Sequence, residues 1–285
     1  MKTILTLTDF SELARAAYPT AVSIAREFGA TLHLGHEVES IPPAYYGYGM
    51  TEAESKEQQN RLRAELVRET NDSAAFAGVQ VEPHLFTPQD VHATVLDFLD
   101  ETPTDLVVVS THGRSGPSHL LLGSFAEKIA QRSPAPVLTW RPRDEGVEPF
   151  RPQSILVPFN FSPGCEAMFP LVKTLAQKYN ARVIVLNVLP IPHEFRYAED
   201  AERRLEERLE SICAAPLDGL DVVYAACPGV PHREIVREAK GRDVDLVVLA
   251  TQGYTGLSRL IFGSTAAKVQ RTAPCSVLTV RPPCE

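Results

Sequence analysis

The sequence contains two copies of one pattern, and this repeat constrains the fold more than any other feature. When residues 110–142 are aligned with residues 250–282, fifteen of thirty-three positions are identical. Glycine, serine and lysine are prominent among them, as in Gly113/Gly253, Gly123/Gly263, Ser124/Ser264 and Lys128/Lys268. Near the start of each copy, Ile4-Leu5 and Phe10-Ser11 match Ile155-Leu156 and Phe161-Ser162. Two copies in a chain of 285 residues predict two similar domains rather than one large domain.

Each copy alternates apolar runs with amphipathic stretches, which is typical of strand-helix-strand units on a parallel sheet. In the first copy we expect strands at 3–8, 31–38, 79–86, 105–109 and 136–140. We expect helices at 11–28, 51–77, 90–100 and from Ser124 onward. In the second copy, Ser162 is expected to cap a helix whose first residue is Pro163. The predicted fold class is α/β, with two repeated five-stranded parallel-sheet domains.

The boundary between the copies is polar and rich in proline. Residues 141–153 contain Pro142, Pro149 and Pro152, which is typical of an interdomain linker. We therefore predict a first domain at 1–142, a linker at 143–152 and a second domain at 153–285.

Charge and hydropathy exclude several kinds of partner. Twenty-eight lysines and arginines oppose thirty-six acidic residues, so the net charge is −8, which disfavours nucleic acid and anionic membranes as partners. No apolar run approaches the length of about 20 residues that a membrane span needs. Five cysteines without a Cys-x-x-Cys pair and an N-terminus without a signal-peptide core predict a cytoplasmic protein.

A glycine-containing loop follows the fourth expected strand of each copy. It consists of a small residue, Gly, nine residues and Gly-Ser, at Ser110, Gly113, Gly123 and Ser124, and again at Ala250, Gly253, Gly263 and Ser264. Glycine lets the backbone approach a ligand, and a helix N-terminus offers N–H groups to an anion, so the loop suits a phosphate.

Other details of the loop bear on this interpretation. His112 and Arg114 flank the first loop and could meet phosphates, whereas their counterparts are the uncharged Gln252 and Tyr254. A purely structural alternative is that Ser124 and Glu127 form a capping box. Ala267 stands at the position of Glu127 in the second copy, so capping does not explain what the copies share.

At these residues the chain resembles the universal stress protein family in its tandem, two-domain form. The loop Gly-x2-Gly-x9-Gly-Ser/Thr occurs in members that bind ATP, and three of its four positions match in each copy. The resemblance implies Rossmann-like domains of the adenine nucleotide α-hydrolase type. It also implies an adenine nucleotide as ligand: ATP, alone or with Mg²⁺.

The resemblance implies further contacts with the nucleotide. It places Asp9 near the ribose or base, together with Thr8 before it, whereas Asn160 stands at the position of Asp9 in the second copy. An amide accepts less well than a carboxylate from two hydroxyls. Backbone groups at Glu37 and Val188 are expected against adenine, although the glutamate carries a charge unsuited to an anionic ligand.

The motifs of several enzyme classes do not occur in the sequence. We find no P-loop, no Gly-x-Gly-x-x-Gly after the first strand and no Gly-x-Ser-x-Gly elbow. The eight histidines are scattered without cysteine or carboxylate partners at ligand spacing in the sequence, so no metal site and no catalytic residue is predicted.

Three functions remain open from the sequence. The first is a stress-response module that binds adenine nucleotide without catalysis. The second is a slow ATPase or self-phosphorylating protein acting through Ser124 or Ser264, and the third is a scaffold with empty sites. The family resemblance also implies that final strands pair antiparallel between subunits. Because the last strands here, 137–140 and 277–280, are edges that need cover, we predict that they pair with each other within the chain as an internal pseudo-dimer. Association of two chains into a homodimer also stays open.

Overall fold

The strands of both copies form one continuous sheet. The computed structural model describes residues 1–38, 52–72, 74–87, 94–111, 123–142, 150–162, 164–190, 200–251 and 262–282. The strands of the first half are β1 Thr3–Leu7, β2 Thr31–Glu37, β3 Val81–Phe86, β4 Leu106–Ser110 and β5 Val137–Trp140. Those of the second are β6 Ser154–Pro158, β7 Arg182–Leu189, β8 Val222–Pro228, β9 Leu246–Ala250 and β10 Ser276–Val280.

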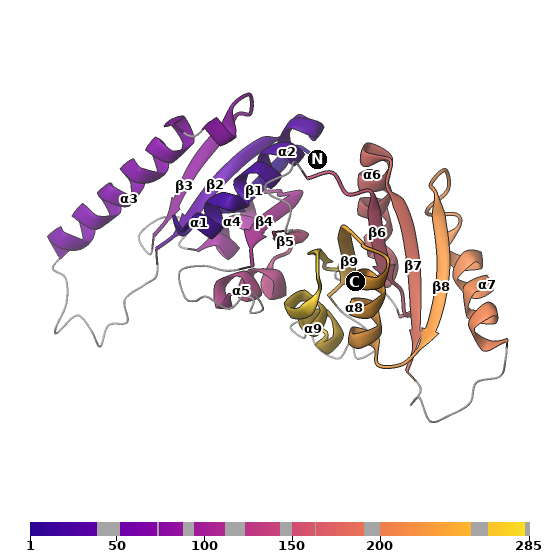
Figure 1. Ribbon diagram of the computed structural model, residues 1–285. Coiled ribbons are helices and arrows are strands. Elements are labelled where there is room, and N and C mark those ends of the chain that lie inside the picture. The colour runs from indigo at the N-terminus through magenta and orange to yellow at the C-terminus, as the bar shows by residue number, and fades with distance from the viewer. Residues whose placement is uncertain are drawn as a thin grey trace.

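The strand order is the same in both halves. It is β3-β2-β1-β4-β5 in the first half and β8-β7-β6-β9-β10 in the second (Figure 1). Pairing within each half is parallel, and each order runs from an outer edge of the sheet inward to the antiparallel pair β5–β10. The predicted α/β class with two five-stranded parallel units is therefore confirmed.

The helices of the first half are α1 Glu12–Ala16, α2 Tyr18–Phe28, α3 Glu52–Asp72, α4 Val95–Glu101 and α5 Ser124–Arg132, with a short 3₁₀ helix at Ala74–Phe76. Those of the second half are α6 Phe169–Tyr179, α7 Ala201–Cys213, α8 Pro231–Gly241 and α9 Ser264–Thr272, with a 3₁₀ helix at Cys165–Met168. None of the described helices has the length and apolar character needed to cross a membrane.

The predicted first helix is interrupted in both halves. In the first half it divides at Ala17, because Pro19 has no N–H to continue the ladder and its ring disfavours the preceding turn. In the second half the expected start at Pro163 lies outside the described residues. The α-helix begins at Phe169, with Pro170 at its start, after Gly164 with φ 84° and a 3₁₀ turn. Ser162 consequently does not act as the cap of α6.

The third expected helix, predicted at 90–100, is α4 in the structure and begins at Val95. Thr94 caps α4, and its side chain and that of Asp97 form a reciprocal capping box. The residues 88–93 before it lie outside the described part of the chain.

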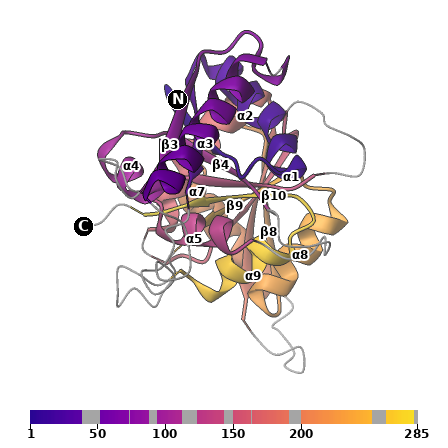
Figure 2. The same ribbon diagram turned by 90° about the vertical axis from the view of Figure 1, so that its left-hand side faces the viewer.

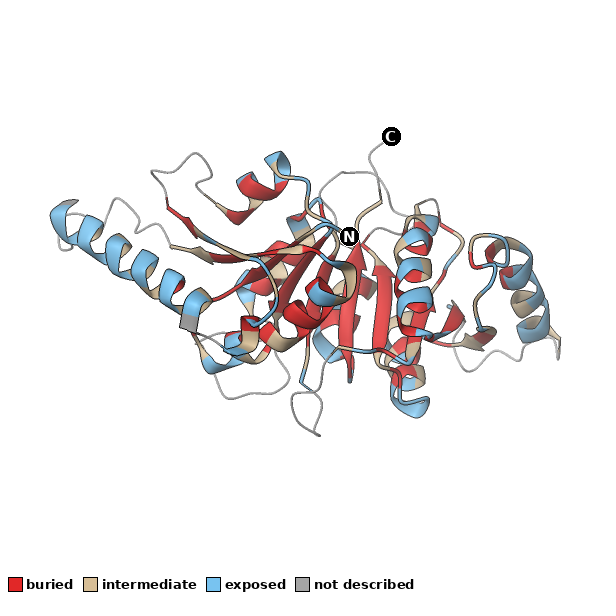
Figure 3. Cartoon of the chain, turned by 90° about the horizontal axis from the view of Figure 1, so that it is seen from above, coloured by how far each residue is buried: buried red, intermediate tan, exposed pale blue. Residues whose placement is uncertain are grey.

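One layer of the core continues across both halves. A cluster of buried side chains on one face of the sheet includes Ile24, Leu34 and Leu138 of the first half and Ile155 and Leu278 of the second. On the opposite face, each half has its own cluster, beneath α4 and α5 or beneath α8 and α9. Figure 3 shows buried residues concentrated along the sheet, whereas α3 and α7 are largely exposed.

The junction of the halves is the pairing of their last strands. Val277 pairs with Thr139, Leu278 with Leu138 and Thr279 with Val137. In Figure 2, the helices α1 and α2 lie in the upper part of the molecule and α8 and α9 in the lower part.

Candidate functional site

The strand order defines one candidate site in each half. In the first half the direction of winding reverses between β1 and β4, and in open parallel sheets ligands bind beyond the carboxyl ends of the strands at such a reversal. Asp9 follows β1 and Ser110 ends β4. Asn160 and Ala250 have the equivalent places beside β6 and β9. The topology therefore brings together residues that lie about a hundred positions apart in each copy.

The turn after the first strand is strained in both halves. Phe10 has φ 62° and Phe161 has φ 59°, a left-handed conformation that bulky residues rarely adopt. Such a conformation costs about 1–3 kcal/mol and is found at binding sites, where the surrounding structure holds it in place. Because the positive φ occurs at the same position in both copies, the strained turn belongs to the fold that the two halves share.

Thr8 holds the first of these turns from inside. Its Oγ1 accepts a hydrogen bond from the backbone N–H of Phe10 at 2.9 Å and another from the Tyr18 hydroxyl at 2.6 Å. Burial raises the pKa of Tyr18, so its hydroxyl remains a donor. Thr8 is itself buried, and His36 Nδ1 lies 2.8 Å from its carbonyl oxygen. These contacts make Thr8 a support of the turn.

Asp9 and Asn160 both accept hydrogen bonds that form local turns. Asp9 Oδ1 accepts from the N–H of Ser11 at 2.9 Å. Asn160 Oδ1 accepts from the N–H of Ser162 at 3.1 Å, from its hydroxyl at 2.6 Å and from the thiol of Cys165 at 2.8 Å. Three donors therefore surround the one side-chain oxygen that Asn160 has, whereas Asp9 has two oxygens.

The glycine loop is anchored identically in the two halves. The N–H of Gly123 donates to Thr111 O at 2.7 Å, and that of Gly263 donates to Thr251 O at 2.7 Å. Thr111 and Thr251 are tied in turn to the last residues of β5 and β10. A Cβ on Gly263 would lie 3.2 Å from Thr251 O, so glycine suits this close approach.

The helix that follows each loop begins without a side-chain cap. Gly123 and Gly263 are the N-caps of α5 and α9, and Ser124 and Ser264 are the first helical residues. The alternative in which Ser124 caps its helix through a box with Glu127 is therefore wrong. An uncapped first turn directs its backbone N–H groups and the positive end of the helix dipole toward the loop.

The remaining loop residues predicted for the site are His112, Gly113, Arg114 and Gly253, which lie outside the described residues.

Glu37 does not present an unbalanced charge to the site. Its Oε2 accepts from the N–H of Val95 at 2.8 Å, which supports the first turn of α4. Its Oε1 lies 3.4 Å from Nζ of Lys128 on α5. The expectation that this carboxylate would disfavour an anionic ligand did not consider these two partners. Val188, its counterpart, packs at the margin of an apolar cluster.

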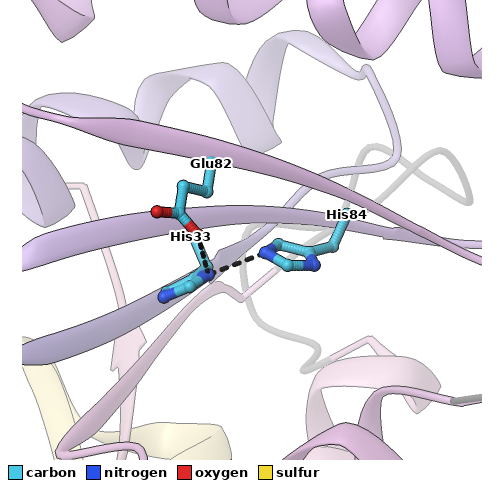
Figure 4. Close-up of side chains that lie close together, drawn as sticks. All are labelled: His33, Glu82 and His84. Carbon is cyan, nitrogen blue, oxygen red and sulfur yellow. Dashed lines mark hydrogen bonds and ion pairs between the residues drawn. The ribbon is translucent and has the colours of Figure 1, made fainter.

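A cluster that the sequence did not reveal lies on β2 and β3 of the first half. His33, Glu82 and His84 each bring one potential ligand atom within 4.8 Å of the others (Figure 4). His33 and His84 are 51 positions apart in the sequence, so their proximity depends on the strand register. The alternation of Glu82, His84 and Phe86 along one strand was the available signal, because it places all three on one face.

Known proteins share both the sequence pattern and the fold. A sequence model of the Universal stress protein family matches residues 1–141 and again residues 152–281. The chain belongs to the universal stress protein family. A universal stress protein of Synechocystis is 24% identical over 99% of this chain and 100% of its own length. One of Methanocaldococcus jannaschii is 32% identical over 38% of this chain and 70% of its own length.

The solved structure of a universal stress protein from Archaeoglobus fulgidus has the same architecture. It has a TM-score of 0.71, is 18% identical, and covers 98% of this chain and 96% of that one. This likeness concerns the fold of the tandem form, and it agrees with the ten-stranded sheet described above.

Proposed function

We propose that this universal stress protein binds an adenine nucleotide, ATP alone or with Mg²⁺, and acts as a non-catalytic module in the stress response. The observation that carries the proposal is the uncapped N-terminus of α5 beside the reversal point of the sheet. The first-turn N–H groups, with the helix dipole, supply donors for phosphate oxygens. The N–H of Gly123, at the base of the loop, is held by Thr111 O.

The first half is the better of the two candidate sites. Asp9 is a carboxylate with two oxygens, which together offer about four acceptor positions, whereas the amide of Asn160 has one oxygen. The single oxygen of Asn160 already has three donors. In addition, Glu37 has Lys128 and the N–H of Val95 as partners, which lowers the repulsion that its charge would exert on phosphates.

We further propose that the β5–β10 pair takes the place of a contact between subunits. Each last strand obtains its missing neighbour from the other half of the same chain, so neither is left as an open edge. The binding of nucleotide at one half then has a direct route, through β4 and β5, to the other half. A readout of the bound state by a partner protein, or a further homodimer, would build on this arrangement.

A direct test begins with the purified full-length protein. The protein is denatured, and any released nucleotide is identified by chromatography. Thermal unfolding is then followed with and without Mg-ATP. Released adenine nucleotide, or a rise in Tm with ATP, supports binding. ATP that stays intact for days supports a non-catalytic module, whereas turnover or phosphorylation of Ser124 would favour the enzyme alternative. An empty protein without a Tm shift would leave the scaffold alternative.

A matched pair of variants locates the site. Gly123→Asp places a carboxylate at the N-cap of α5, where aspartate stabilises a helix but occupies the N–H groups and repels phosphate. The expected result is loss of ATP binding in a protein that still folds, as circular dichroism should show. Gly263→Asp makes the same change in the second half and is expected to leave most of the binding intact.

A further inference from the structure

The face of the first half that carries His33, Glu82 and His84 has a composition suited to a metal ion. In the parallel pair β2–β3, His33 lies opposite Glu82, and His84 lies two residues further along β3, opposite Gly35. Residues in register and residues two apart share a face of a parallel sheet. Figure 4 shows the three side chains converging on one point between the strands.

The distances suit coordination by a small divalent cation. His33 Nδ1 is 2.7 Å from His84 Nε2 and 3.7 Å from Glu82 Oε2. Ligands at about 2.0–2.2 Å from a tetrahedral zinc ion are separated by about 3.4 Å, a value between these two distances. Adjustments of side-chain torsions therefore suffice to seat an ion, without movement of either strand.

The surroundings orient the ligands and leave one side open. Gln80 Nε2 donates to Glu82 Oε1 at 3.1 Å, which turns the other oxygen toward His33. The ring of Phe98 from α4 lies 5.7 Å from that of His33 and 5.0 Å from that of His84. The His33 side chain is 12% exposed, whereas that of Glu82 is 47% exposed, so an ion could enter from the solvent beside Glu82.

The second half shows that the fold does not require polar residues at these positions. The strand registers place Ile184 at the position of His33, Val223 at that of Glu82 and Ala225 at that of His84. Ile184 and Ala225 belong to an apolar cluster that packs against α8 and α9. The first half therefore has three ligand-bearing side chains where the same architecture is stable with three apolar ones.

We propose that His33, Glu82 and His84 form a binding site for a divalent transition-metal ion, and specifically for Zn²⁺. Two imidazoles and one carboxylate are a donor set that zinc accepts, with water at the fourth position. The ion replaces the proton that the two imidazole nitrogens share, and that proton moves to the other nitrogen of its own ring.

The test is Zn²⁺ binding to the full chain, measured by titration calorimetry and by metal analysis after dialysis. We expect one saturable site for each chain, and we expect Co²⁺ at the same site to give intense visible absorption bands typical of low coordination number. His33→Gln and His84→Gln should each lower the affinity by at least about tenfold. His232→Gln removes a histidine on α8 in the other half and should leave the affinity unchanged.

A triple variant separates loss of metal from loss of folding. The variant combines His33→Ile, Glu82→Val and His84→Ala, so that the first half carries the residues of the second half at these positions. Circular dichroism should show that it is folded, and titration calorimetry should show that it binds no Zn²⁺. The proposal is overturned if wild-type protein shows no saturable binding, or if this folded variant binds Zn²⁺ as the wild type does. The second result would assign the bound ion to other surface groups, and the cluster would then have only a structural role.

Discussion

Leu138 lies opposite Leu278, the residue at the same position of the other repeat, in the antiparallel pair of β5 and β10. Their neighbours alternate in the same way, because Val277 meets Thr139 and Val137 meets Thr279. Both leucines are 1% exposed and belong to the cluster that spans the two halves. The two halves are thus joined through equivalent residues, so a substitution that destabilises one half should also destabilise the other.

The first prediction tests this coupling with Leu138→Ala. Truncation of a fully buried leucine costs about 2–5 kcal/mol of unfolding free energy. We expect one cooperative urea transition at lower denaturant, seen equally by far-UV circular dichroism and by the fluorescence of Trp140, the single tryptophan. Leu13→Ala, at a residue 38% exposed on α1, is the control and should change stability by less than about 0.5 kcal/mol. Two separate transitions would show that the halves unfold independently.

The second prediction concerns the contribution of Asp105 to the stability of the fold at low pH. Asp105 Oδ2 accepts from the backbone N–H groups of Lys2 at 2.5 Å and Thr3 at 3.0 Å. Burial alone would raise the pKa of Asp105, but these two hydrogen bonds and the nearby positive charges outweigh it, so the pKa is lowered. The folded state therefore gains stability from ionised Asp105 above about pH 4, and this gain is lost as the pH falls through the depressed value.

Asp105→Asn tests this pH dependence, through the difference in unfolding free energy between wild type and variant. The variant should be less stable than wild type near pH 7, and the gap in unfolding free energy should shrink as the pH is lowered toward 3. Urea unfolding at several pH values measures the gap. A gap that does not vary with pH would mean that the charge of Asp105 contributes nothing to it.

The third prediction concerns Glu37, which connects β2 to α4 and α5. Glu37→Val gives the first half the residue that its counterpart Val188 provides in the second half. The substitution removes the acceptor for the N–H of Val95. We expect a loss of about 1 kcal/mol in unfolding free energy, as for other lost helix caps. Glu57→Val changes an exposed residue of α3 that pairs with Arg61, and should cost less than about 0.5 kcal/mol. Equal effects of the two changes would contradict the capping role.

The repeat in the sequence was sufficient to predict the class and the order of elements. Local signals also predicted the start of the first helix near residue 11, where the Oγ of Ser11 accepts from the N–H of Ala14 at 3.1 Å. They did not predict the division of that helix at Ala17, because the effect of Pro19 competes with an otherwise continuous apolar face. Similarly, Ser162 resembles a cap in sequence but donates to Asn160 in the structure.

The candidate site shows where sequence reasoning reaches its limit. Spacing predicted the loop, its final glycine and the helix after it, because these residues are neighbours along the chain. The partners of Glu37 and the cluster of His33 with His84 are contacts between strands and helices far apart in sequence. They depend on the register of β2 with β3 and on the packing of α5, which one sequence does not specify.

The last prediction asks which half holds the nucleotide, by exchanging Asp9 and its counterpart Asn160. Asp9→Asn retains an oxygen for the Asx turn with Ser11, so stability should change little, but it loses a charged acceptor. We expect the affinity for ATP to fall about tenfold, as for loss of a hydrogen bond to a charged group. Asn160→Asp should leave the affinity nearly unchanged, because donors from Ser162 and Cys165 already surround that oxygen. If titration calorimetry instead shows no effect of Asp9→Asn and tighter binding with Asn160→Asp, then the second half is the nucleotide site.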